Sequence, residues 1–291
     1  MIIANPIYDT VFKYMMSDSK VARTFLSAII GEKIVELDFT STEYTLKAGV
    51  EKRQIDRTLE QITVCRFDFA AKIETESGDF KTVIIELQKA KFATDIMRFR
   101  RYLGAMYQSV ENTHDRHRVK ARQIYCIYLL NYEIDLSDSP VIKVDYTASD
   151  LATGEEIDGK NEFIKSLNHK SWIVQVRQLR EKRRNELENL LGIFDQDSIT
   201  GDRHILNIDE SQFSGEYRHI IRKLREACES RQVRVEMQME DDYISELLMK
   251  DEIIAENEKI IAEKDKSLAD KDKSLAEKDK EIEELKRQLG K

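Results

Sequence analysis

The chain contains few of the residues that interrupt regular secondary structure: its 291 residues include only two Pro and ten Gly. This scarcity argues against long loops and flexible linkers, so we expect mainly helices and strands with short connections. Cysteine is also rare. Cys65, Cys126 and Cys228 are odd in number and far apart, which argues against a disulfide framework or a zinc site and favours buried free thiols.

Long apolar runs and an excess of positive charge are absent too. No stretch approaches the roughly 18 apolar residues that span a bilayer, and residues 1–6 lack the basic and apolar regions of a signal peptide. We therefore expect no membrane association and a cytoplasmic location. The net charge is −8, from 47 Lys and Arg against 55 Asp and Glu. Contact with nucleic acid would then depend on local basic patches and bound cations.

The spacing of apolar residues predicts an α/β layer fold. Helical periodicity extends over 5–30, with a break near Ser17 and Asp18, and recurs over 93–110. We expect Pro6 in a first helical turn and Gly31 at a helix end. Strand-like segments are 34–40, 64–73, 81–88, 124–130 and 141–146, and helices are expected to dominate 161–193 and 211–239.

The C-terminal part of the chain has a heptad repeat. Its apolar position is occupied by Ile254, Ile261, Leu268, Leu275, Ile282 and Leu289. The second core position is polar, with Asn257 followed by three Lys, until Leu285. We expect 236–291 to be a long charged helix whose coiled coil over 250–291 is marginal or needs a partner, either another copy or a different helix. The alternative is an isolated solvated helix stabilised by charge pairs four residues apart.

A hairpin is the most informative local feature. The strand-like segments 64–73 and 81–88 flank the turn-forming sequence Glu76-Ser77-Gly78-Asp79. Since side chains alternate between the two faces of a strand, Glu86 and Gln88 are expected to share one face.

The expected register of this hairpin brings two acids together. If the chain turns about Ser77, Asp68 lies directly opposite Glu86, with β-carbons roughly 4.5 to 5.5 Å apart. Two carboxylates at that separation among apolar residues repel each other unless a cation lies between them. Oxygen ligands favour Mg²⁺ or Mn²⁺, which can activate water and polarise a phosphodiester. The alternative is a pair of acids on an exposed side of the sheet.

These residues resemble a known nuclease core. Asp68, the turn with Gly78 and the following Glu86-Leu87-Gln88 resemble the Asp…Glu-x-Lys core of the PD-(D/E)XK nuclease superfamily. The opening Asn5-Pro6-Ile7-Tyr8-Asp9-Thr10-Val11-Phe12-Lys13 and the strand Ile84-Ile85-Glu86-Leu87-Gln88 resemble its bacterial branch of nuclease-family transposases, or recombination-promoting nucleases. The resemblance covers residues 5 to 235 and is strongest before 130.

The resemblance implies an α/β fold with a restriction-endonuclease-like mixed central sheet flanked by helices. A helical region and a C-terminal coiled-coil helix follow. The nuclease-like domain would span 1–235, with a core over about 5–150 and a helical extension over about 160–235, ahead of the tail 236–291.

The resemblance also implies roles for three residues. In the superfamily the two acids bind the metal, as Asp68 and Glu86 would here, and a Lys two residues after the Glu orients water or stabilises charge. Gln88 stands at that position, as it often does in the resembling branch. An amide lacks a full positive charge, so slow turnover or a pseudoenzyme is the alternative. Lys89 is expected to face away from Glu86.

Further candidate residues flank the hairpin. Asp9 and Lys13 are four residues apart on one helical face, where Asp9 would reach the metal or the two would form a surface ion pair. Candidates for contact with a phosphate backbone are Lys13, Arg98, Arg101, Tyr102 and Gln108. The alternative is an exposed basic face, as it is for the basic segments 116–120 and 177–184.

The main functional hypothesis is a Mg²⁺-dependent DNA endonuclease linked to recombination or a mobile element. Strand transfer uses the same metal chemistry and stays open beside hydrolysis. The alternative hypothesis is a catalytically weak or inactive nuclease-like binding module that assembles through its coiled-coil tail.

Overall fold

The computed structural model describes most of the chain, in two compact units. The described residues are 1–40, 43–47, 62–66, 68–89, 95–108, 123–134, 137–157, 164, 167–180 and 183–290. The first unit is Met1–Glu240 and the second is Asp241–Lys291.

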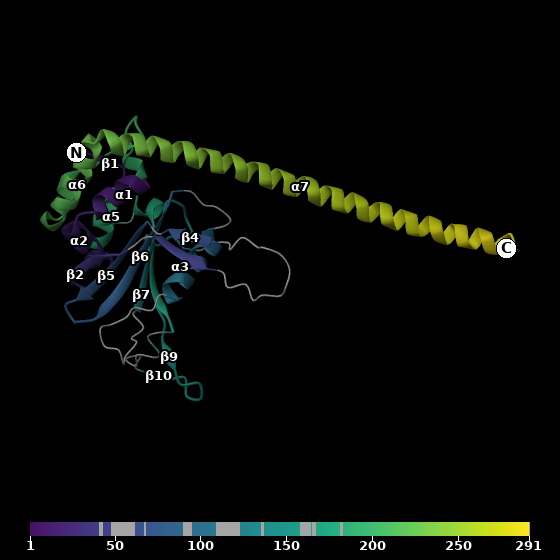
Figure 1. Cartoon of the computed structure of the whole chain (residues 1–291), viewed down its shortest axis with the longest axis horizontal. Helices are drawn as coiled ribbons and strands as arrows, with labels where there is room; N and C mark the ends of the chain where they lie inside the picture. The colour runs from purple at the N-terminus through teal and green to yellow at the C-terminus, as the bar shows by residue number, and fades with distance from the viewer. Residues whose placement is uncertain are drawn as a thin grey trace. The chain divides into compact units, whose positions relative to one another are not determined.

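In the described part of the first unit, six strands form one mixed sheet (Figure 1). Their order is β2 (Ile34–Phe39), β5 (Phe69–Thr75), β6 (Phe80–Gln88), β7 (Gln123–Leu130), β11 (His169–Gln175) and β8 (Val141–Val144). Strands β6, β7 and β11 are parallel, and the outer pairings are antiparallel. The predicted α/β class, with a mixed central sheet flanked by helices and a C-terminal helix, is confirmed.

The first helices form as expected, with one difference at the start. Helix α1 (Asp9–Met16) and helix α2 (Ser19–Ile30) are separated at Ser17 and Asp18, and the Asp18 carboxylate accepts hydrogen bonds from the first N–H groups of α2. Gly31 ends α2 with φ 77°. The prediction for Pro6 is wrong, because the helix begins at Asp9 and Pro6 lies in the preceding turn.

The two faces of the sheet are covered differently. One face packs against a large apolar core that includes α1, α2, α5 (Glu186–Leu191) and α6 (Arg218–Glu229). The aromatic rings of Phe12, Phe25 and Phe194 contact one another there. The other face carries a smaller cluster, Ala70, Ile84, Ile124 and Cys126, beneath α3 (Asp95–Gln108). Residues on this second face of β5 and β6 therefore lie on the α3 side.

The expected helical extension over about 160–235 is wrong in part. Residues His169–Gln175 form β11, which lies between β7 and β8 in the central sheet. Trp172 and Val174 are buried there, and pairing with two neighbours overrides any helical tendency of the segment. Further along, β12 (Ile205–Asn207) pairs with β1 (Ile2–Ala4), so the N-terminus is held by a distant segment.

The segment 64–73 is not one strand. β4 (Ile62–Arg66) pairs with β3 (Glu43–Lys47) in a separate small sheet, and β5 begins at Phe69 in the central sheet. Asp68 occupies the junction between them.

The remaining short elements are β9 (Ala148–Ser149), β10 (Glu156–Ile157) and the 3₁₀ helices η1 (Val176–Leu179), η2 (Gly192–Phe194), η3 (Gln196–Ser198), η4 (Glu210–Gln212) and η5 (Gly215–Tyr217).

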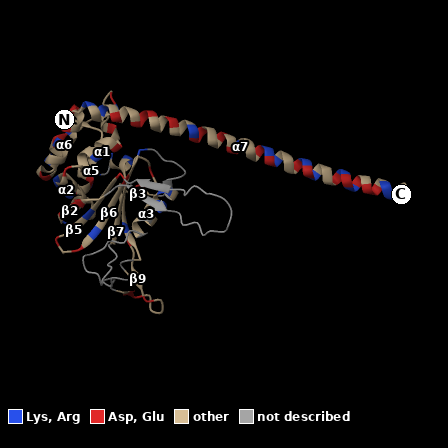
Figure 2. Ribbon diagram, in the orientation of Figure 1, with Lys and Arg blue, Asp and Glu red and all other residues tan. Residues whose placement is uncertain are grey.

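The C-terminal helix is α7 (Arg231–Gln288), which confirms the predicted long helix. Every described residue from 251 to 290 is exposed. Figure 2 shows acidic and basic residues interspersed along this helix. In the described part of the chain, no helix is both long and apolar enough to cross a membrane.

Candidate metal centre

The hairpin has the register that its sequence predicts. Phe69 pairs with Ile85 and Ala70 with Ile84, so continuing the register by one residue sets Asp68 opposite Glu86. The turn contains Gly78 at φ 79°, a left-handed conformation that glycine adopts without steric cost. Asp68 lies just outside β5, and its Oδ2 accepts a hydrogen bond of 2.5 Å from the backbone N–H of Leu87. The carboxylate of Asp68 is thereby attached to β6 beside Glu86.

The Asp68 carboxylate has a perturbed acidity. The pKa of Asp68 is raised from 3.8 to about 7, mainly by burial and also by the negative charge of Asp9. The Leu87 N–H and the positive charges of Lys13 and Arg98 act in the opposite direction. Groups from α1, β6 and α3 therefore all influence the Asp68 carboxylate.

Glu86 and Gln88 are buried at the end of β6, at 4% and 6% exposure. By alternation they share the α3 face with Ile84. Glu86 pairs in register with Tyr128 of β7, and its charge contributes, after burial, to the raised pKa of both Cys126 and Tyr128. The sequence therefore places a buried carboxylate on the face where α3 covers the sheet.

Asp9 provides a second acid near Asp68. It begins α1, and its Oδ2 accepts a hydrogen bond of 2.5 Å from Lys13, so the expected pair on one helical face does form. Within the described part of the chain, its Oδ1 is buried and has no hydrogen-bond partner. A buried carboxylate oxygen in that state is costly unless a cation or water satisfies it. One oxygen of the Asp9 carboxylate is thus paired with Lys13, and the other is buried without a partner among the described residues.

The sequence did not predict one contributor to this region. The backbone N–H of Asp9 donates a hydrogen bond of 2.9 Å to Glu240 at the end of the first unit. Thr10 also bonds Glu236 through its hydroxyl. Two acids from the start of α7 thereby hold the N-terminus of α1. No local signal marks them, because more than two hundred residues separate the partners.

The predicted phosphate-contacting residues lie in different settings. Lys13 and Arg98 are close enough to Asp68 for their charges to lower its pKa. Arg101 is exposed on α3, and Tyr102 packs beside the small α3 cluster. Gln108 ends α3, and its side chain lies outside the described residues.

Lys89 follows β6 on the side opposite Glu86, as expected. Its ammonium group lies 3.4 Å from the ring centre of Tyr8, a residue of the large core. Lys89 therefore does not take the place of the superfamily Lys on the Glu86 face.

The two other basic segments are 116–120 and 177–184. The segment 116–120 lies outside the described residues. In 177–184, three arginines form local ion pairs: Arg180 with Asp197, Arg183 with Asp195 and Arg184 with Glu188, each at 2.7 Å. These pairs support the expectation of a solvated face in 177–184.

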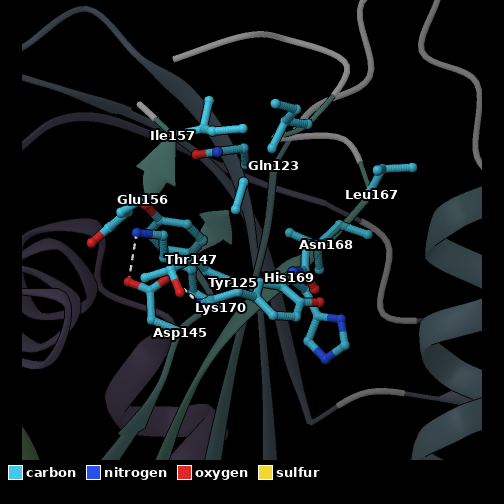
Figure 3. A pocket seen from close by; sticks show the side chains of 14 residues that line it. Gln123, Tyr125, Asp145, Thr147, Glu156, Ile157, Leu167, Asn168, His169 and Lys170 are labelled. Carbon is cyan, nitrogen blue, oxygen red and sulfur yellow. Dashed lines mark hydrogen bonds and ion pairs between the residues drawn. The ribbon is translucent and has the colours of Figure 1, made fainter. Parts of the chain in front are cut away.

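The described residues contain a separate cavity whose lining does not include Asp9, Asp68 or Glu86. It has a volume of about 360 Å³ and is lined by residues that include Tyr125, Asp145, His169 and Lys170 (Figure 3). Lys170 and Asp145 form an ion pair of 2.8 Å there. Because Gln123 and His169 begin parallel strands, this cavity lies at the opposite end of β7 and β11 from the end that adjoins Gln88.

Among the described residues, no three His, Cys, Asp or Glu side chains gather as a ready metal-ligand group. Comparisons with models of protein families, with curated proteins and with solved structures gave no match. Asp68, Glu86 and their surroundings are therefore the part of the chain whose chemistry indicates a function.

Proposed function

We propose that the chain is a divalent-metal-dependent nuclease that hydrolyses phosphodiester bonds in DNA. The observation that carries this proposal is the position of Asp68. Its carboxylate accepts a hydrogen bond from the backbone N–H of Leu87, and Asp68 lies in register with Glu86. The negative charge of Asp9 contributes to the raised pKa of Asp68. Acids from three segments of the chain thus lie near one end of the hairpin, although they do not form a closed ligand group among the described residues.

The residues at this end fit Mg²⁺ or Mn²⁺. Carboxylate oxygens are the donors that such cations prefer, and Mg²⁺ commonly binds one or two protein carboxylates together with water and phosphate oxygens. Asp68 and Glu86 would hold the ion, and the buried Oδ1 of Asp9 offers a further oxygen. When bound, the ion supplies an activated water and neutralises charge on the phosphate.

The neighbouring side chains have complementary roles in this proposal. Gln88 shares a strand face with Glu86 and would orient the attacking water through its amide, without supplying a positive charge. Arg98 and Lys13 carry positive charge beside Asp68, where they would position a DNA phosphate. Their contribution explains how a chain of net charge −8 would bind DNA locally.

The test measures metal binding and DNA cleavage separately. Calorimetry with Mg²⁺ or Mn²⁺ alone should detect binding to the wild type, and plasmid DNA should be nicked only with metal present. Asp68→Asn and Glu86→Gln should weaken metal binding and lower nicking at least about a hundredfold. The matched control is Asp38→Asn, which removes an exposed carboxylate from β2 and should change neither measurement.

Equal nicking by the wild type and both site variants would refute the nuclease proposal. An absence of metal binding together with intact DNA would favour the second candidate, a nuclease-like binding module. One observation favours that candidate specifically: the second unit exposes a helix with a regular apolar stripe and has the character of an assembly segment.

A further inference from the structure

The second unit presents an unpartnered apolar stripe. We define the apolar stripe as Ile254, Ile261, Leu268, Leu275, Ile282 and Leu289. In the structure Leu268 is 56% exposed and Leu275 is 60% exposed, and the other members are similarly open to solvent. Residues seven apart on a helix stay nearly aligned, so the stripe follows one line along α7.

Charged rows of opposite sign border this stripe. Asp265 lies four residues after Ile261 and three residues before Leu268. Lys264 lies three residues after Ile261 and four residues before Leu268. At about 100° per residue, the two charges lie about 50° to either side of the stripe. The acidic row is Glu258, Asp265, Asp272 and Asp279, and the lysine row is Lys264, Lys271 and Lys278.

Most of the bordering charges have no opposite charge three or four residues away on their own helix, unlike the charges of the outer face; Lys278, three residues before Glu281, is the exception. On the outer face, an acid lies four residues after each lysine: Asp270 after Lys266 and Glu277 after Lys273. By contrast, Asp265 and Asp272 have only Ile, Leu or Ala at three and four residues in either direction. The same positions around Lys264 hold only Ile, Ser or Leu. The two rows are therefore available to pair with opposite charges of another chain.

We propose that α7 pairs with α7 of a second copy of this chain, parallel and in register, along the apolar stripe. In a parallel pair that meets along the apolar stripe alone, the row on one side of the stripe faces the opposite row of the partner helix. The acidic row then faces the lysine row along both edges of the seam. An antiparallel pair would instead set acid against acid and lysine against lysine.

The charged rows also determine the register. In register, Lys264, Lys271 and Lys278 face Asp265, Asp272 and Asp279 of the second copy, respectively, along both edges of the seam. Lys286 follows the acidic row one heptad after Asp279. A shift by one heptad would set Lys278 against Lys286 and replace an attraction with a repulsion along one edge.

Parallel pairing attaches two first units to the same end of the coiled coil. The dimer would then carry two copies of the metal centre, a consequence that rests on the proposed function. The pairing itself is independent of DNA and metal, so each proposal can fail without the other.

Sedimentation of the full chain at micromolar concentration tests the pairing. The wild type should be a dimer. Reversing the lysine row, with Lys264→Glu, Lys271→Glu and Lys278→Glu, should raise the dissociation constant at least about tenfold, which corresponds to about 1.4 kcal/mol. Adding Asp265→Lys, Asp272→Lys and Asp279→Lys exchanges the rows and should restore the dimer.

A matched control makes the same change of net charge on the outer face. The control variant carries Lys266→Glu, Lys273→Glu and Lys280→Glu and should remain dimeric. Circular dichroism of each variant verifies that the helix persists. A monomeric wild type, or equal dissociation of the control and the row variant, would overturn the proposal.

Orientation is tested by oxidising the full chain with Ile282→Cys. Ile282 lies toward one end of the stripe, so the introduced thiols meet only in a parallel dimer. We expect a disulfide-linked dimer on a non-reducing gel, absent from the oxidised wild type and much reduced in the lysine-row background. A chain that sediments as a dimer but does not cross-link would overturn the parallel arrangement.

Discussion

Asp68→Asn is expected to stabilise the first unit at neutral and alkaline pH when metal is removed by a chelator. The pKa of Asp68 is raised by burial from 3.8 to about 7, so the folded state binds more protons than the unfolded state between these values. The free energy of unfolding of the wild type therefore falls as pH rises through that range and levels off above it. Asn at this position does not titrate. The free energy of unfolding of the variant should therefore exceed that of the wild type by an amount that grows over the same pH range.

The size of the effect follows from the same two values. The difference between 3.8 and about 7 corresponds to about 4 kcal/mol at most, at about 1.36 kcal/mol per pH unit. Asp68 is partly exposed, and solvent screening lowers that figure. We expect the variant to gain about 2 kcal/mol at pH 8 and close to nothing at pH 4.

Urea unfolding, monitored by the fluorescence of Trp172, the single tryptophan, measures this difference in the free energy of unfolding at a series of pH values. Asp38→Asn is the control, since it removes an exposed acid. Saturating Mg²⁺ should stabilise the wild type but not the Asp68→Asn protein, since a bound cation stabilises only a state that binds it. A difference between Asp68→Asn and wild type that is the same at every pH would refute the assignment of a buried, perturbed carboxyl.

Three other substitutions test separate parts of the structure. Gln175→Ala removes a fully buried amide that accepts a hydrogen bond from the Ile134 N–H and donates to the carbonyl groups of Ser137 and Ser139, and should lower the free energy of unfolding by about 2 to 4 kcal/mol in urea titrations. Phe12→Ala should lower the free energy of unfolding by about 3 to 5 kcal/mol in the same assay, since it leaves a cavity beside the rings of Phe25 and Phe194. Gln88→Ala should slow plasmid nicking about tenfold while calorimetry shows unchanged binding of Mn²⁺, because Gln88 acts on water. Losses below about 1 kcal/mol for the first two, or lost metal binding for the third, would contradict these interpretations.

Local features of the candidate site could be predicted from the sequence because they depend on short-range geometry. Strand parity assigns Glu86 and Gln88 to one face, and the turn at Ser77 and Gly78 determines the register with Asp68. The pair formed by Asp9 and Lys13 is likewise local, because residues four apart on a helix are neighbours. The hydrogen bond from the Asp9 N–H to Glu240 had no such signal.

The sequence by itself determined the elements with strong periodicity: the first two helices, the hairpin, the buried strand β7 and the long helix with its apolar stripe. Only the tertiary structure decided that 169–175 is a strand, since β11 is formed by pairing with β7 and β8 rather than by its own propensity. The tertiary structure also decided that Asp9, Lys13 and Arg98 surround Asp68. Burial and neighbouring charge depend on which distant segments meet, and those contacts set the pKa that distinguishes Asp68 from an ordinary surface acid.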